Sequence, residues 1–241
     1  MRVRILSSPR PMSEELKLTS RSIRSFVVRN GRITQGQQRA FDENWLTFGI
    51  EYTQSHIDWS AEFGRDAPLW IEIGFGNGIQ TAHMAELYPQ TNFVGIEIHM
   101  PGVGRLLSQI QERQLKNLRI IRHDAVEVLQ NCVSDEQAER ILLFFPDPWP
   151  KKKHHKRRIV QADFTKLVSQ KLKTGGYFHL ATDWEEYALH MLETIGAEKD
   201  LENQSTDNTF IPPPEYRLIT KFEKRGLKRG HEVWDLLFRK S

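Results

Sequence analysis

The stretch Leu69-Trp70-Ile71-Glu72-Ile73-Gly74-Phe75-Gly76-Asn77-Gly78 predicts the fold of this chain. Its first five residues form a short, mostly apolar run that is typical of a buried strand. Three alternating glycines follow, and a helical pattern then continues to about Tyr88, just before Pro89. Glycines between a strand and a helix permit a tight turn and let a ligand approach the backbone closely. The stretch therefore predicts a strand–turn–helix unit with a binding site at the turn.

The same alternation of strand and helix continues along the chain. Apolar runs predict four further strands at Asn92–Ile96, Leu118–Ile121, Ile141–Phe145 and Tyr177–Ala181. Helical stripes lie between these runs, and Gly175-Gly176 is expected to end the helix that precedes the last of them. Repeated units of this kind predict an α/β domain with a mostly parallel, seven-stranded sheet and helices on both faces.

The two ends of the chain depart from this pattern. Residues 1–33 are rich in Ser and Arg, and we expect either a flexible basic arm or a terminal segment without a role. Residues 34–241 are expected to form the domain itself. Near the C-terminus, Tyr216–Phe222 and Val233–Phe238 predict two strands that pair antiparallel at the edge of the sheet.

Composition argues against several classes of protein. The single cysteine, Cys132, excludes an internal disulfide and argues against a cysteine-ligated zinc site, so we expect no metal. The first ten residues lack the apolar segment of a leader peptide, and no run approaches the length of a membrane span, which together predict a soluble cytoplasmic protein. The net charge is only +3, but basic residues concentrate in 2–32, 151–158 and 217–240. This distribution favours an anionic partner. Monomer and homodimer both remain open, with the monomer preferred.

Three acids stand at the carboxyl ends of three consecutive predicted strands. Glu72 precedes the first glycine, Glu97 follows the second strand and Asp124 follows the third. A dinucleotide site has no obvious need of an acid beside its pyrophosphate, whereas S-adenosylmethionine carries a sulfonium and an ammonium group that Glu72 would offset. Glu97 is placed to reach ribose hydroxyls. Asp124 is placed either to bind an adenine amino group or to cap the next helix.

A second informative stretch runs from Phe144 to Arg158, FFPDPWPKKKHHKRR. Its three prolines end the preceding strand, because proline lacks the N–H that a ladder needs. Asp147 then lies at the same sheet edge as the three acids, and Trp149 is expected either to stack on a base or to pack the loop onto the core. Six Lys or Arg residues and two His follow directly, which favours an RNA contact over an ordinary solvated run.

These residues resemble a known family. Pro146-Asp147-Pro148-Trp149-Pro150-Lys151-Lys152 and the basic residues after it resemble the signature of bacterial tRNA (guanine-N7)-methyltransferases. Thr182-Asp183 and Thr220-Lys221-Phe222-Glu223 are also similar to that family, and the resemblance spans about residues 35–240. It implies a class I, Rossmann-like methyltransferase fold and transfer of a methyl group from S-adenosylmethionine to N7 of a guanine in the variable loop of tRNA, at conventional position 46.

The resemblance also implies roles for individual residues. Asp147 is expected to be the catalytic carboxylate and to contact the cofactor. The expected cofactor contacts are Glu72, Gly74, Gly76, Gly78, Glu97 and Asp124. The expected substrate contacts are Lys151, Asp183, Thr220, Lys221, Phe222 and Glu223, and the expected RNA contacts are Lys153, His154, His155, Lys156, Arg157 and Arg158.

The expected chemistry needs no strong base, because guanine N7 offers a lone pair and carries no proton. Asp147 is therefore expected to orient the ring and to offset its developing positive charge. Three alternatives remain open on the sequence alone: methylation of an amine on another RNA base, a nucleotide-dependent oxidoreductase, and a non-catalytic RNA-binding protein on the same fold.

Overall fold

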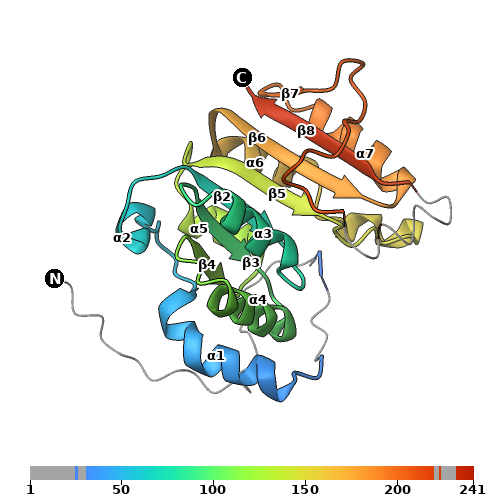
Figure 1. Ribbon diagram of the computed structural model, residues 1–241. Coiled ribbons are helices and arrows are strands. Elements are labelled where there is room, and N and C mark those ends of the chain that lie inside the picture. Colours follow the sequence, from blue (N-terminus) through green and yellow to red (C-terminus); the bar gives the residue numbers. More distant parts are fainter. Residues whose placement is uncertain (1–24, 27–30, 220–222, 224–231) are drawn as a thin grey trace.

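One eight-stranded sheet organises the computed structural model, which describes residues 25–26, 31–219, 223 and 232–241 (Figure 1). The strand order is β1-β4-β3-β2-β5-β6-β8-β7. The strands are β1 (Gly49–Ile50), β2 (Leu69–Ile73), β3 (Asn92–Ile96), β4 (Leu118–Ile121), β5 (Ala138–Phe144), β6 (Leu172–Thr182), β7 (Leu201–Asn203) and β8 (Trp234–Lys240). All pairings among β1 to β6 are parallel, and β8 runs antiparallel to both β6 and β7.

The order of the strands reverses at β2. From β2 the chain moves outward through β3 to β4, and it then returns to place β5 on the other side of β2. In an open α/β sheet, ligands bind beyond the carboxyl ends of the strands at such a reversal. The fold therefore predicts a binding site at the loops after β2, β3, β4 and β5.

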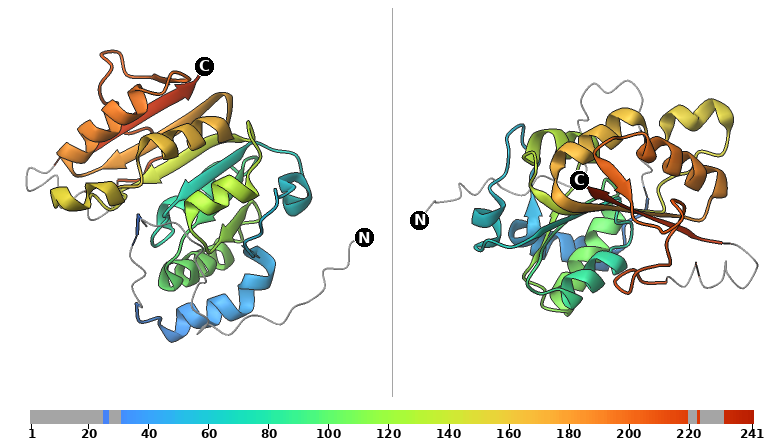
Figure 2. Two further views of the ribbon diagram at one scale, coloured as in Figure 1. Left: turned by 180° about the vertical axis from the view of Figure 1, so that it is seen from behind. Right: turned by 90° about the horizontal axis from the view of Figure 1, so that it is seen from above.

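Helices cover both faces of the sheet (Figure 2). Side chains of β2 alternate between two apolar clusters: Trp70 packs with α1, α3 and α4, whereas Ile71 and Ile73 pack with α2, α5, α6 and α7. The helices are α1 (Gln35–Phe48), α2 (Trp59–Phe63), α3 (Ile79–Leu87), α4 (Met100–Glu112), α5 (Ala125–Cys132), α6 (Ala162–Lys171) and α7 (Glu185–Gly196), with a 3-10 helix, η1, at Lys152–Arg157. No helix among the described residues is long and apolar enough to cross a membrane.

The predicted fold class is confirmed, and β2, β3 and β4 have the predicted bounds, whereas β5 and β6 begin earlier than the predicted strands at 141–145 and 177–181. The sheet has eight strands, because the two-residue β1 pairs with β4 and the short β7 pairs with β8. The antiparallel β8 is therefore an inner strand, and β7 forms the edge. Of the arm predicted at residues 1–33, only residues 25–26 and 31–33 lie within the described part of the chain.

Two local predictions are wrong. Gly175-Gly176 does not end a helix: α6 ends at Lys171, and the glycines lie inside β6, where the pairing with β5 is irregular and Gly175 has φ 79°. Residues 216–219 of the predicted strand Tyr216–Phe222 form no strand, and residues 220–222 lie outside the described part. The prolines at 212–214 supply no ladder N–H, and β7 already occupies the free edge of β8.

Candidate active site at the carboxyl edge of the sheet

The glycine loop connects β2 to α3 and is shaped by close packing on one side only. Gly74 and Gly76 have φ values of 68° and 58°, and a Cβ on either would meet no atom within 4 Å. The opposite side is crowded, since a Cβ on Gly102 would lie 2.1 Å from the carbonyl oxygen of Gly76. A Cβ on Gly78 would lie 2.7 Å from Leu106. The first two glycines therefore leave an open backbone surface, whereas Gly78 lets α3 pack against α4.

A cavity of about 330 Å³ lies beside this loop. Its lining includes Gly74, Gly76, Glu97, Asp124 and Asp147, which come from the loops after β2, β3, β4 and β5. Five residues predicted to contact a cofactor are thus brought together. Glu72 and Gly78 stand outside the lining, and Glu72 is buried beneath the glycine loop.

Hydrogen bonds of the Glu97 and Asp124 carboxylates shape the cavity. The Glu97 carboxylate accepts hydrogen bonds from the amides of Gly76, at 2.9 Å, and of Ile98 and His99, at 2.6 and 3.0 Å. Asp124 is the N-cap of α5 and accepts from the Val126 amide at 2.8 Å. The structure thus shows Asp124 both capping its helix, one of the two predicted alternatives, and facing the cavity.

Glu72 is a buried carboxyl group close to the cavity. Burial raises the pKa of Glu72 to about 7, a hydrogen bond from the Thr81 hydroxyl at 2.6 Å opposes the shift, and the neighbouring charge of Glu97 adds to it. A carboxyl group that titrates near neutral pH is ready to lose its proton when a cation arrives next to it.

Three interacting side chains, His123, Glu127 and Tyr52, lie at the β4–α5 turn beside the cavity. His123 lines the cavity, contacts the Glu127 carboxylate at 2.6 Å and stacks on Tyr52 with ring centroids 3.7 Å apart. Sequence reasoning missed this group because Tyr52 lies 71 residues before His123, outside any recognised motif.

Asp147 is exposed and lies on a loop that the protein holds in an unusual conformation. Phe145 and Trp149, on either side of it, have φ values of 51° and 45°, which non-glycine residues rarely adopt. Such backbone strain persists where the surrounding contacts enforce it, and it clusters at functional sites. The Trp149 indole N–H donates to the Ser25 carbonyl oxygen at 3.2 Å, and the Arg157 guanidinium lies 5.0 Å from the Trp149 ring. These contacts join Trp149 to Ser25 and to η1, so packing of the loop onto the core, one of its two predicted roles, stays a prediction.

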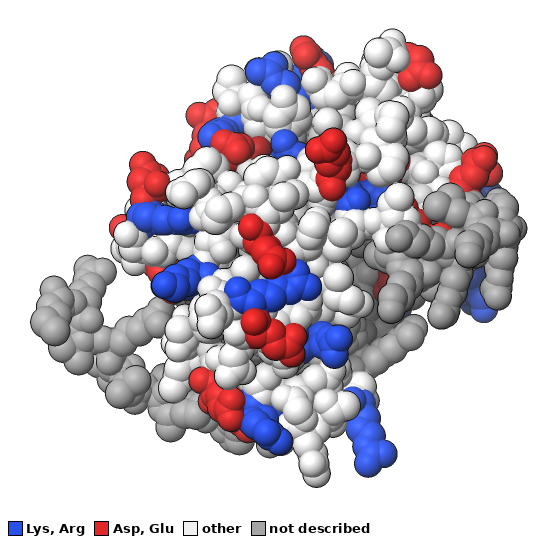
Figure 3. All heavy atoms as spheres, viewed as in Figure 1, with Lys and Arg blue, Asp and Glu red and all other residues white. Residues whose placement is uncertain are grey.

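The basic run divides into an exposed part and a buried end. Lys151, Lys152, Lys153 and Lys156 are exposed. His154 and His155 are half-buried; partial desolvation and nearby positive charges lower the pKa of His154, and His155 lies 3.7 Å from Glu186. The face drawn in Figure 3 shows acidic and basic side chains interspersed.

Arg158 corrects the predicted RNA contacts. Only 1% of Arg158 is exposed, and its guanidinium donates to the Pro148 carbonyl oxygen at 2.8 Å and to the Glu186 carboxylate at 3.2 and 3.3 Å. It also lies 4.8 Å from the centre of the Tyr187 ring. Arg158 therefore holds the Asp147 loop from inside and does not belong with the RNA-binding residues predicted for this run.

The residues predicted to contact the substrate come from three separate parts of the chain. Asp183 is exposed at the carboxyl end of β6, and Lys151 is exposed after the proline loop. Glu223 is buried, and its carboxylate accepts two hydrogen bonds from the Arg217 guanidinium, at 2.7 and 3.0 Å. The predicted contacts Thr220, Lys221 and Phe222 lie outside the described residues.

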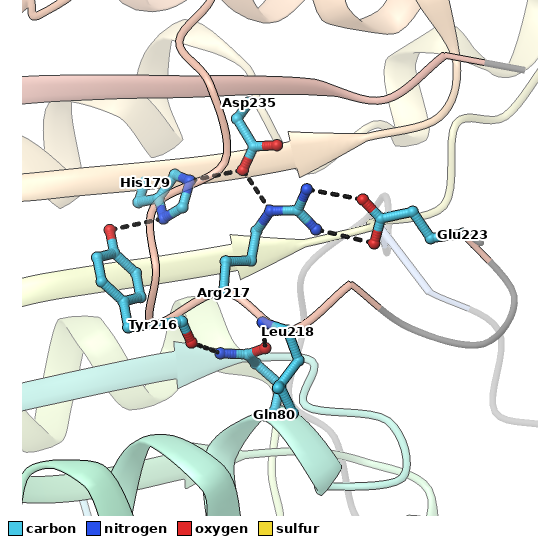
Figure 4. A network of polar contacts seen from close by, with 7 residues as sticks. All are labelled: Gln80, His179, Tyr216, Arg217, Leu218, Glu223 and Asp235. Carbon is cyan, nitrogen blue, oxygen red and sulfur yellow. Dashed lines mark hydrogen bonds and ion pairs between the residues drawn. The ribbon is translucent and has the colours of Figure 1, made fainter. Parts of the chain in front are cut away.

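Arg217 belongs to a buried polar network that sequence reasoning missed (Figure 4). Its guanidinium pairs with Asp235 as well as Glu223, and Asp235 accepts from His179 at 2.9 Å. The Tyr216 hydroxyl donates to the other ring nitrogen of His179, also at 2.9 Å. The available signal was a histidine and an aspartate, His179 and Asp235, each standing inside an apolar strand. Among the described residues, no group of His, Cys, Asp and Glu could hold a metal ion.

Comparisons with known proteins agree with this geometry. A family model described as "Putative methyltransferase" matches residues 66–236. A tRNA (guanine-N(7)-)-methyltransferase of Shewanella frigidimarina is 51% identical over 221 residues, covering 92% of this chain and 93% of the relative. One of Klebsiella pneumoniae is 53% identical over 218 residues, covering 90% of this chain and 91% of the relative. The 16S rRNA methyltransferase KamB has a similar fold, with a TM-score of 0.54 at 15% identity over 79% of this chain and 96% of that one. The chain belongs to the tRNA (guanine-N(7)-)-methyltransferase family.

Proposed function

We propose that this protein transfers a methyl group from S-adenosylmethionine to N7 of a guanine in the variable loop of tRNA. The observation that carries the proposal is the placement of Asp147 in the same cavity wall as Glu97 and Asp124. The relatives from Shewanella and Klebsiella carry the name of this activity over about nine-tenths of the chain. The proposed place of action is the cytoplasm, and the proposed state is a monomer.

The cavity residues fit the proposed cofactor. Glu97 offers a carboxylate to ribose hydroxyls, and Asp124 lines the cavity where the adenine would lie. The open faces of Gly74 and Gly76 admit a chain of atoms where a Cβ would intrude. Glu72 lies below with a carboxyl group ready to ionise against an ammonium group. When bound, S-adenosylmethionine would supply a methyl group on a sulfonium, whose sulfur leaves as the neutral thioether of S-adenosylhomocysteine.

Asp147 acts on the guanine side of the cavity. Guanine N7 attacks with its own lone pair, so Asp147 need not remove a proton before the methyl group moves. Its carboxylate accepts from the N1–H or the exocyclic amine of guanine and faces the ring as positive charge develops. Asp183 and Lys151 contribute further contacts to the nucleoside. The rigid loop around Asp147 keeps the ring in line with the transferred methyl group.

The basic run before Arg158 holds the tRNA. The exposed Lys153 and Lys156, with the half-buried Arg157, His154 and His155, bind phosphates beside the cavity. Because Arg158 is buried, we assign the phosphate contacts to the residues before it. A guanine in a loop is unstacked and gripped by its edges, which is the usual mode of sequence-specific RNA recognition.

Chemical cleavage of the reacted tRNA tests the proposal. The protein is incubated with unmodified tRNA and labelled S-adenosylmethionine, and the tRNA is then treated with borohydride and aniline, which break the chain at N7-methylguanosine. We expect one cut, in the variable loop. Quantitative methyl transfer that leaves the chain intact would refute N7 as the target atom, and an absence of transfer with tight NAD binding would refute the cofactor.

A further inference from the structure

The buried polar network links two parts of the molecule that are far apart in the sequence. Gln80 stands in the first turn of α3, directly after the glycine loop. Its side-chain amide donates to the Tyr216 carbonyl oxygen at 2.7 Å and accepts from the Leu218 amide at 2.7 Å (Figure 4). This reciprocal pair satisfies the backbone of residues 216–218 as a neighbouring strand would. It therefore fixes the position of this segment relative to the cofactor loop.

The side chains of the same segment are held from the opposite direction. Tyr216 and Arg217 are 7% and 4% exposed, and they contact His179 of β6 and Asp235 of β8. Burial lowers the pKa of His179, so its neutral ring accepts from Tyr216 and donates to Asp235. The segment is thus connected on one side to the cofactor half of the sheet and on the other to the half that carries Asp147.

Arg217 also binds a residue that lies later in the chain. Its two terminal nitrogens bind Glu223, the last of the predicted substrate contacts at 220–223, in a buried, bidentate ion pair. The Arg217 guanidinium lies 5.9 Å from the Phe145 ring, two residues before Asp147. Several buried charges are arranged here at a cost in desolvation, and stability alone is weak grounds for keeping them.

We propose that Gln80 and Arg217 are positioning residues, which hold residues 216–219 and Glu223 beside the Asp147 loop so that the bound guanine is presented to the glycine-loop side of the cavity. This inference rests on the proposed function. Neither residue lines the cavity. Each acts through the residues it contacts: Gln80 fixes the backbone of residues 216–218, and Arg217 joins Asp235 to Glu223.

The test uses an isosteric substitution and a matched control. Gln80→Met keeps the side-chain volume and removes both hydrogen bonds. Gln137→Met is the control, because Gln137 is also half-buried and accepts two hydrogen bonds, from Trp59 and Ser134, next to the start of β5 at the other end of the strand from Asp147. Arg217→Lys is a second variant, which keeps the positive charge and loses the bidentate geometry.

Two readouts separate positioning from folding. Hydrogen exchange at the Leu218 amide should be at least about fivefold faster in Gln80→Met and unchanged in Gln137→Met. Turnover on tRNA is divided by the concentration of protein that binds S-adenosylhomocysteine. It should fall about tenfold in Gln80→Met, with KM for tRNA changed less than about threefold. Arg217→Lys should show the same loss of turnover.

The outcomes distinguish the two proposals. Wild-type protein that leaves tRNA guanine unmodified would overturn the proposed function. Active wild-type protein together with normal turnover in both variants would overturn the positioning inference. The inference is also overturned if exchange at Leu218 is unchanged in Gln80→Met, or if Gln137→Met loses as much turnover per site.

Discussion

Arg158 is predicted to stabilise the Asp147 loop, although it closes a basic run whose lysines are exposed. Replacing it by Met keeps an unbranched apolar stem and removes the guanidinium. The lost hydrogen bond from a charged donor to the Pro148 carbonyl oxygen is worth about 2 kcal/mol, and the contact with the Tyr187 ring about 1 kcal/mol. We count nothing for Glu186, because its carboxylate is exposed to solvent. The variant should therefore be about 3 kcal/mol less stable.

Thermal unfolding and tRNA binding measure this effect together. A loss of this size should lower Tm by about 6–12 °C in a chain of this length. Lys156→Ala is the matched comparison, because Lys156 is exposed two residues earlier. That variant should keep its Tm and bind tRNA more weakly, with a salt dependence reduced by about one phosphate contact.

The two variants should thus separate stability from binding within three residues of sequence. Arg158→Met should lose turnover because the loop that carries Asp147 loses its internal support. An Arg158→Met protein with unchanged Tm and a flatter salt dependence of tRNA binding would refute the reasoning, because it would return Arg158 to the RNA surface.

Three further predictions concern the cavity. The pKa of Glu72 in the folded apo protein, about 7, is above its ordinary value of 4.5, so the stability that this group contributes is present at low pH and lost as pH rises through about 7. Glu72→Gln should remove that pH dependence from denaturant unfolding. In the wild type, S-adenosylhomocysteine affinity should rise between about pH 6 and 8, and Glu72→Gln should abolish this rise; the same change of affinity with pH in both proteins would contradict a role at the cofactor. Gly102→Ala should weaken S-adenosylhomocysteine binding by at least about tenfold in calorimetry, because its Cβ would collide with the Gly76 carbonyl and push α4 from the glycine loop. Asp147→Ala should lose most turnover in the tRNA methylation assay with S-adenosylhomocysteine affinity changed less than about threefold, and retention of wild-type turnover would exclude a catalytic role.

The strands of the cofactor half could be predicted from the sequence because their signals are local. Apolar runs flanked by glycine or acid specify β2, β3 and β4 to the residue. Four residues around the cavity, Glu97, Asp124, Asp147 and Gly76, follow from their positions at strand ends on one sheet edge. Local periodicity is sufficient for such elements.

Other features depend on contacts between distant residues and carry no local signal. Arg158 looks like its basic neighbours, and only the packing of Tyr187 and Pro148 around it shows that it is buried. The glycines at 175–176 read as a helix end, because the irregular pairing of β6 with β5 cannot be seen in either strand alone. Gln80 is an ordinary helical glutamine until Tyr216 and Leu218 are placed beside it.

The reversal of strand order at β2 has an evolutionary consequence. Every residue assigned to the cofactor before Asp147 lies in a contiguous piece of chain, residues 72–124, on one side of that reversal, whereas Asp147, Asp183 and Glu223 come from the later piece. Selection for a different RNA can therefore act on the later piece while the earlier one is inherited intact. Gln80 of the earlier piece bonds to Tyr216 and Leu218 of the later piece, so a change in the later piece must keep or replace these two hydrogen bonds.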